Sequence, residues 1–155
     1  MSLVTVLKTI GRIIPSQIPK GTAIGNRILK PIYNLFFKNK IQKTTIWETI
    51  NLYLNPSECI GGNLFFSPQL YDRKERELIK KYLPRNGVFI DIGANIGAYT
   101  LWAASLMDKN GRILSIEADE DTYKELIKNI NSNSWIQPRI ACENIGVSDK
   151  DEALP

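Results

Sequence analysis

Two carboxylates and two glycines stand where the sequence passes from apolar runs into helical patterns. Residues 88–100 read VFIDIGANIGAYT, with Asp91 two positions before Gly93 and Gly97 four positions after it. Glu117 lies 24 residues beyond Gly93, at the end of a second apolar run. Because the carboxyl ends of parallel strands meet at one edge of a sheet, both carboxylates are expected at the same edge. This arrangement predicts a nucleotide-type binding corner, with backbone amides at the turn and carboxylates for cations or hydroxyls.

The glycine spacing distinguishes two classes of ligand. A dinucleotide fingerprint, G-x-G-x-x-G, would need glycine at the positions of Asn95 and Ala98. Asn95 places a side chain where a pyrophosphate requires close backbone approach, which counts against NAD or FAD. The observed D-x-G-x-N-x-G spacing suits S-adenosylmethionine better, because this ligand has no phosphate and carries an ammonium and a carboxylate at its amino-acid end.

Each residue of the corner has an expected role toward S-adenosylmethionine. Asp91 would pair with the ammonium, and Gly93 would adopt a positive φ and allow close backbone approach. Gly97 would let the following helix lie close to the sheet, and Glu117 would accept both ribose hydroxyls. Two simpler interpretations stay open: Asp91 as a cap of the following turn, and Glu117 as a solvated strand end.

Three stretches of the sequence resemble one protein family. VFIDIGANIGAYTLWAA, GRILSIEADEDTYKELIKNINSN and ENIGVSDKDEAL are similar to the FkbM-type family of class I S-adenosylmethionine-dependent methyltransferases, over residues 50–155. The resemblance implies methylation of a hydroxyl oxygen on a sugar or small molecule. No nucleic-acid partner is expected. It identifies no catalytic residue, and it places residues 143–148 near the adenine. It implies that the cofactor contacts are Asp91, Gly93, Ala94, Asn95, Gly97, Glu117 and Ala118.

The order of elements predicts an α/β fold with a parallel sheet. Strands are expected at 88–92, 112–117 and 139–147, and helices at 96–107 and 119–131, so that strand and helix alternate. The almost wholly apolar run at 88–92 predicts a strand buried on both faces. Together with the resemblance, this predicts a Rossmann-like class I methyltransferase fold whose sheet is truncated after these strands. The first strand would then have one unpaired edge.

Three regions are expected along the chain. The first is a basic N-terminal helical arm, because it holds eight basic residues and no acid. Within it, amphipathic helical spacing appears over 3–14 and over 24–36, where Pro31 would allow a kink. The second region leads into the domain, and the third is the incomplete cofactor-binding half of a methyltransferase. Their bounds are 1–43, 44–87 and 88–155.

The lead-in region is expected to mix strands and a helix. Residues 45–56 are rich in β-branched and aromatic side chains, which predicts a strand closed by Asn55-Pro56. We interpret Gly61-Gly62 as a turn and 63–66 as a second short strand. Residues 69–83 follow with a helical pattern.

The charge distribution indicates a second kind of partner. Of the 20 basic residues, eight lie in 1–43, which leaves 12 against 16 acids in the rest. A basic amphipathic arm fits the surface of a membrane that contains anionic lipid. It equally fits helices that pack their apolar sides on the domain or on another copy. No run reaches the roughly 18 apolar residues that a membrane span needs. We therefore expect a cytoplasmic protein, with peripheral membrane contact as an option.

The composition excludes several kinds of active site. The chain has no histidine, so it supplies neither a histidine base nor a Ser-His-Asp triad. Cys59 and Cys142 form no CxxC motif, so no metal site is expected and a reducing compartment fits best. Two alternatives to an active enzyme stay open: a non-enzymatic fragment and a membrane-surface or interaction module. A partner chain could also supply the missing C-terminal half of the fold.

Overall fold

The computed structural model describes residues 2–13 and 25–149, and the chain divides into two compact units. Unit 1 is Met1–Arg73 and unit 2 is Lys74–Pro155. The contacts between residues thus divide the chain once, after Arg73. The boundaries expected from the sequence after residues 43 and 87 stay predictions. No helix among the described residues combines the length and the apolar character needed to cross a membrane.

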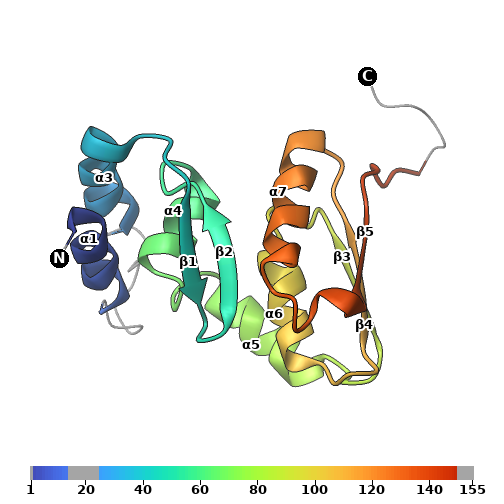
Figure 1. Cartoon of the computed structure of the whole chain (residues 1–155). Helices are drawn as coiled ribbons and strands as arrows, with labels where there is room; N and C mark the ends of the chain where they lie inside the picture. The colour runs from blue at the N-terminus through green and yellow to red at the C-terminus, as the bar shows by residue number, and fades with distance from the viewer. Residues whose placement is uncertain (1, 14–24, 150–155) are drawn as a thin grey trace. The chain divides into compact units, whose positions relative to one another are not determined.

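Unit 1 consists of helices packed around a β-hairpin (Figure 1). Its elements are α1 (Leu3–Arg12), the π-helical turn η1 (Gly25–Leu29), α3 (Lys30–Phe37), β1 (Gln42–Ile46), β2 (Ile50–Leu54) and α4 (Cys59–Phe66). The two strands pair antiparallel, with Gln42 opposite Leu54. Helices α1 and η1 both contact α4. The helix expected over 24–36 is η1 followed by α3, and Pro31 lies in the first turn of α3, where proline is tolerated.

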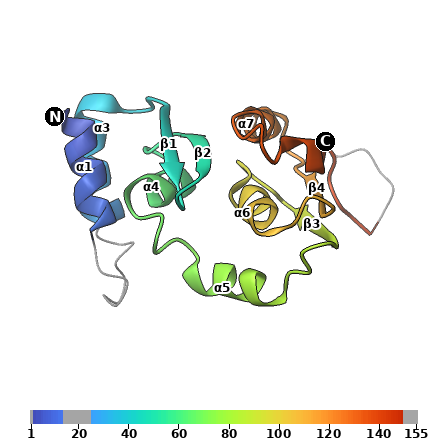
Figure 2. The ribbon, with the colours of Figure 1, turned by 60° about the horizontal axis from the view of Figure 1, so that its bottom comes forward.

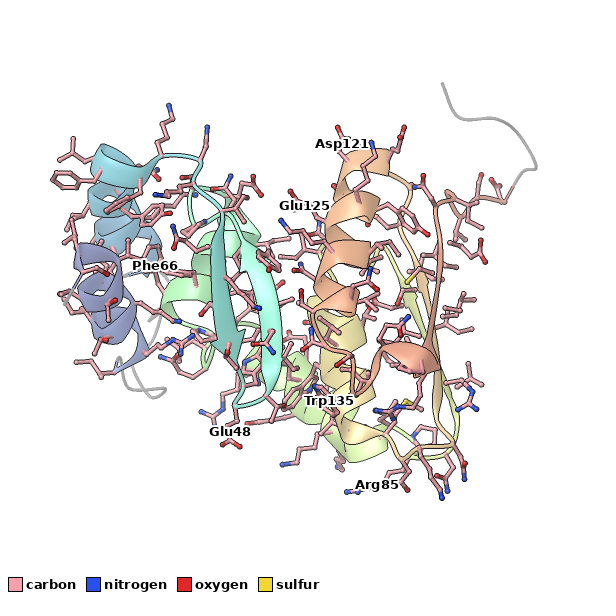
Figure 3. All side chains as sticks on the ribbon, viewed as in Figure 1. Glu48, Phe66, Arg85, Asp121, Glu125 and Trp135 are labelled. Atoms are coloured by element: carbon pink, nitrogen blue, oxygen red, sulfur yellow. The ribbon has the colours of Figure 1, made fainter. Side chains whose placement is uncertain are left out.

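Aromatic side chains form the centre of unit 1. Tyr33 of α3 is fully buried, and its ring centroid lies 5.5 Å from that of Phe37 and 6.0 Å from that of Phe66. Phe66, labelled in Figure 3, is fully buried as well. The Tyr33 hydroxyl donates a hydrogen bond to the Lys40 carbonyl at 2.8 Å, which satisfies its polar end. Much of the predicted basic arm is therefore packed into a folded unit through its apolar side.

The structure corrects two predictions in unit 1. Within the strand predicted over 45–56, the part at Ile50–Leu54 is confirmed as β2, which ends at Asn55-Pro56 as predicted. The part at 45–49 is wrong, because 45–46 end the preceding strand β1 and 47–49 form a turn with Trp47 and Glu48 at positive φ. This turn was missed because it contains neither glycine nor proline. The turn predicted at Gly61-Gly62 and the strand predicted at 63–66 are both wrong, because these residues form α4. A side chain at Gly61 would overlap the Asn55 carbonyl, so this glycine allows the buried helix to lie against the hairpin.

Unit 2 contains a three-stranded parallel sheet in the order β3-β4-β5. Its elements are α5 (Arg73–Tyr82, which begins at the last residue of unit 1), β3 (Val88–Ile92), α6 (Ala98–Leu106), β4 (Arg112–Ile116), α7 (Glu120–Asn131), the 3-10 turn η2 (Gln137–Arg139) and β5 (Ile140–Glu143). Strand and helix alternate as predicted, and the α/β fold with a parallel sheet is confirmed. Asp91, Ser115 and Cys142 lie opposite one another across the three strands.

Helix α7 begins with a side-chain cap at the carboxyl end of β4. Asp119 is the N-cap residue, and its carboxylate accepts a hydrogen bond from the Thr122 amide at 2.8 Å. Glu120 and Asp121 follow in the first turn, where negative charge is favourable to the helix dipole. The start of α7 is thus fixed by local sequence, directly after the turn that leaves β4.

One face of the sheet is uncovered in the described structure. Figures 1 and 2 show α6 and α7 on the same side of the strands. On the other side, Val88, Ile90 and Ile92 of β3 are between 56% and 65% exposed. The prediction that 88–92 is buried on both faces is therefore wrong for the described residues, because both helices cover the opposite face. The outer edge of β3 has no partner strand among the described residues, as expected.

Candidate functional site

The loop from β3 to α6 is anchored on the end of β4. The amides of Gly93 and Ala94 both donate to the carbonyl of Ile116, each at 2.9 Å. The amide of Gly97 donates to the carbonyl of Ala94 at 2.9 Å, which closes a turn before α6. These bonds hold the loop across the carboxyl ends of β3 and β4, where the sequence placed the binding corner.

Three residues of this loop adopt positive φ, at 73° for Gly93, 49° for Asn95 and 89° for Gly97. The prediction of a positive φ at Gly93 is confirmed. A Cβ atom added at Gly93 would meet no atom within 4 Å, so this backbone faces open space that a ligand could enter. A Cβ atom at Gly97 would lie 2.8 Å from Cδ1 of Leu126. The close contact that Gly97 permits is therefore with α7 rather than with the sheet.

The carboxylate of Glu117 ties the loop to the turn after β4. Its Oε2 accepts a hydrogen bond from the Asn95 amide at 2.8 Å, and its Oε1 accepts one from the Asp119 amide at 3.0 Å. Glu117 is half-buried, so it is not merely a solvated strand end. Each carboxylate oxygen has two acceptor positions, which leaves capacity for further hydroxyl donors. The sequence predicted a ligand contact here but not this organising role within the loop.

Asp91 points under α6 and is held by a threonine. The Thr100 hydroxyl donates to Oδ2 of Asp91 at 2.6 Å and lies 2.8 Å from the Ser115 hydroxyl. Desolvation by burial raises the pKa of Asp91, the hydrogen bonds from Thr100 oppose this, and the charge of Glu117 adds to the rise. Because Thr100 lies in the first turn of α6, the interpretation of Asp91 as a cap has structural support.

The two carboxylates create a negative region at this edge of the sheet. The charge of Glu117 contributes to the raised pKa of Asp91. Within the described residues, neither Asp91 nor Glu117 forms an ion pair with a lysine or an arginine. A positively charged ligand would relieve this repulsion and favour the ionised form of Asp91.

All the predicted site residues lie at the carboxyl edge of β3 and β4. Ala94 is a buried residue of the loop, and Ala118 is exposed in the turn after β4. With methyl side chains, the two residues offer chiefly backbone groups to a ligand. The structure brings together the following residues: Asp91, Gly93, Ala94, Asn95, Gly97, Glu117 and Ala118.

Several supporting residues were not identified from the sequence. Asn144, just after β5, donates through its Nδ2 to the carbonyls of Glu117 (2.8 Å) and Ala118 (3.1 Å). Asn129 of α7 is fully buried and donates to the Ile96 carbonyl at 2.9 Å. A polar residue on the apolar side of a helix was the available signal for Asn129. Asn144 lies within the stretch 143–148 that the resemblance placed near the ligand.

The described residues contain no group of three or more histidine, cysteine, aspartate or glutamate side chains that could hold a metal ion. Cys59 and Cys142 are free cysteines. Burial, with the neighbouring charge of Glu143, raises the pKa of Cys142 to about 11, so its thiol stays protonated near neutral pH.

Comparison with known proteins gives likenesses in structure alone. No family model matches the chain, and no curated protein matches it. The crystal structure of P. horikoshii TYW2 in complex with MeSAdo is similar with a TM-score of 0.56 and 20% identity, over 83% of this chain and 50% of that one. A candidate transferase from Pyrococcus horikoshii is similar with a TM-score of 0.54 and 21% identity, over 83% and 50%. The chain thus spans about half the length of these solved structures, and it shares their Rossmann-like class I methyltransferase fold.

Proposed function

We propose that this chain is the cofactor-binding half of an S-adenosylmethionine-dependent methyltransferase. The observation that carries the proposal is the edge of the sheet where the open backbone at Gly93 adjoins two carboxylates without a cation, Asp91 and Glu117. S-adenosylmethionine bears a sulfonium and an ammonium, so its positive charges suit this negative region. The MeSAdo in the TYW2 structure is an analogue of this cofactor, and the shared fold supports the same class of ligand.

Each site residue has a role in this proposal. The free acceptor positions of Glu117 receive the ribose hydroxyls, while its bonds to the loop keep the carboxylate oriented. Asp91 attracts the ammonium, and Thr100 fixes the direction of its carboxylate. The backbone around Gly93 approaches the amino-acid end of the cofactor without a side chain in the way.

The proposed reaction is O-methylation, and the support for this finer assignment is the sequence resemblance over 50–155 to FkbM-type methyltransferases. The acceptor is then a small-molecule or glycan hydroxyl. Its oxygen forms a bond to the methyl carbon as the carbon–sulfur bond breaks, S-adenosylhomocysteine leaves, and the hydroxyl proton passes to a base. Holding the oxygen and the methyl group in line supplies much of the rate in such a transfer. No residue of this chain is assigned as the base.

A further stretch of polypeptide belongs to the working enzyme in this proposal. The exposed apolar face of β3, at Val88, Ile90 and Ile92, and its unpaired edge support an additional covering layer. This layer could come from a partner chain or from sequence outside residues 1–155. The two free cysteines favour a reducing compartment such as the cytoplasm.

Calorimetric titration of S-adenosylmethionine into the purified chain tests the proposal. Glu117→Ala removes the carboxylate of the site, and Glu120→Ala is the matched control, because it removes the same charge from an exposed pair with Lys124. Circular dichroism establishes that each variant is folded. We expect binding by the wild type and the control, and a loss of roughly a hundredfold in Glu117→Ala, since two charge-assisted hydrogen bonds are removed. Absent binding by the folded wild type, or equal binding by both variants, would overturn the assignment.

A further inference from the structure

The helical segment η1–α3 of unit 1 carries apolar side chains on two different sides. Leu29 and Tyr33 are buried, at 3% and 0% exposure, and supply the core of the unit. A second set lies on the outside, and we call it the apolar stripe; its side chains are between 40% and 77% exposed. The apolar stripe consists of Ile28, Ile32, Leu35 and Phe36.

The spacing of the apolar stripe places its members on one side of the helix. Positions four, seven and eight residues apart share a helical face, so the four side chains form a continuous outer ridge. Helix α1 lies beside α3 in both Figures 1 and 2. It contributes exposed apolar side chains of its own at Leu3 and Ile10. Unit 1 therefore exposes large apolar side chains on both helices, in addition to those that its core buries.

The charged residues next to the apolar stripe along the chain are all basic. Arg27 immediately precedes the first residue of the apolar stripe, and Lys38 lies two residues after the last one. Both side chains are exposed. Residues 1–43 contain eight basic residues and no acid. No carboxylate forms an ion pair with Arg27 or Lys38 in the part of the chain that the structure describes. An apolar ridge bordered by cations matches a surface that is negative outside and apolar just beneath.

We propose that the apolar stripe docks unit 1 on a membrane surface that contains anionic lipid. The four side chains enter the boundary between headgroups and acyl chains, while Arg27 and Lys38 contact the headgroup phosphates and carboxylates. This inference concerns unit 1 alone and is independent of the cofactor site.

Two other occupants fit the observations less well. A second copy of this chain would bring two such basic segments together, each with Arg27 and Lys38 exposed, and like charges across an interface are unfavourable. A nucleic acid would meet the basic residues, but of the apolar stripe only Phe36 is aromatic, and the other three side chains are aliphatic and cannot stack on bases. Anionic lipid satisfies both the charge and the aliphatic side chains.

Point variants are needed to test the proposal, because deletion of residues 1–43 would remove Tyr33 from the core. Leu35→Ser with Phe36→Ser removes two of the four side chains of the apolar stripe without touching buried positions. Arg27→Glu with Lys38→Glu reverses two exposed charges. Trp135→Ser is the control, since this tryptophan is a large apolar side chain of unit 2 that is 52% exposed (Figure 3).

The experiment is sedimentation of the full chain with vesicles of phosphatidylcholine alone, or of phosphatidylcholine with roughly a third phosphatidylserine. We expect binding only to the phosphatidylserine vesicles, reduced by salt, and unchanged in Trp135→Ser. The serine pair, Leu35→Ser with Phe36→Ser, should weaken binding to these vesicles roughly tenfold or more, because apolar burial is lost. Arg27→Glu with Lys38→Glu should weaken it roughly tenfold or more, because the attraction to anionic lipid is lost. Circular dichroism confirms the fold, and S-adenosylmethionine titration should be the same for the wild type and all variants.

Three results would overturn the proposal. One is equal binding of the wild type to neutral and anionic vesicles, or to neither. The second is vesicle binding that the serine pair leaves unchanged. The third is that the serine pair instead abolishes a dimer seen by light scattering, or binding to a single-stranded oligonucleotide, which would assign the apolar stripe to those partners.

Discussion

Replacement of Glu117 tests whether the site is organised by its own carboxylate before any ligand arrives. In Glu117→Ala, the amides of Asn95 and Asp119 lose their acceptor. The bond to Asn95 is partly buried, and a hydrogen bond to a charged group is worth about 1.5–3 kcal/mol. The bond to Asp119 is exposed, where water replaces the lost acceptor, so it adds little.

The expected cost of Glu117→Ala is therefore about 2 kcal/mol in the free energy of unfolding. Glu117→Gln keeps a carbonyl oxygen that can accept from the Asn95 amide, and it should cost about half as much, because a hydrogen bond to an uncharged acceptor is weaker. Urea unfolding followed by circular dichroism measures both free energies. Hydrogen exchange at the Asn95 amide gives a local measurement, and this amide should exchange faster in Glu117→Ala than in the wild type.

Glu120→Ala serves as the control for these measurements, because Glu120 is exposed and its ion pair with Lys124 is worth little. It should unfold within a few tenths of a kcal/mol of the wild type. The reasoning is refuted if Glu117→Ala unfolds with the same free energy as Glu120→Ala while the Asn95 amide remains protected. The loop would then keep its conformation without the Glu117 carboxylate.

Three further predictions concern the packing and charge of unit 2. Gly97→Ala should lower the free energy of urea unfolding by about 2–4 kcal/mol, because the residue has a positive φ and its Cβ atom would overpack against Leu126. In a Leu126→Ala background the same change should cost only about 1–2 kcal/mol, because the overpacking is removed. Burial raises the pKa of Asp91 in the folded state above its ordinary value of 3.8, so this group stabilises the fold less as pH rises through the folded pKa. Asp91→Asn should therefore gain stability over the wild type from about pH 4 upward in thermal melts, and equal gains at all pH values would contradict this. Arg139 donates to the carbonyls of Ala104, Met107 and Asp108 at the end of α6, so Arg139→Met should lower the free energy of unfolding by about 2–3 kcal/mol, and a change below 0.5 kcal/mol would count against this anchoring.

The elements of unit 2 were predictable because each carries a local signal. The apolar run at 88–92 is β3 with the predicted bounds, and Asp119 caps α7 directly before its helical pattern begins. The third strand was predicted over 139–147 but ends at Glu143. Beyond that point the Asn144 side chain binds the turn after β4 and the ladder stops, which the local composition does not reveal.

Unit 1 was less predictable because its elements are set by long-range packing. The run CIGGNLFF is apolar except for Asn63 and fits a buried strand or a buried helix equally well, and it is the helix α4. Contact with the hairpin at Asn55 decides between them, since only glycine fits there. The hairpin turn at Trp47 and Glu48 is likewise made by residues without turn preference.

The sequence by itself determined which residues meet at the edge of the sheet. Strand ends of parallel neighbours coincide, so the spacing from Asp91 to Glu117 was sufficient to bring them together. Only the tertiary structure decided where these side chains point: Glu117 toward the Asn95 amide, and Asp91 toward Thr100 on α6. It also decided that β3 is covered on one face alone and that the apolar stripe of α3 lies outside the core. The reason is physical, since side-chain direction and burial depend on partners distant along the chain, whereas strand and helix patterns are local.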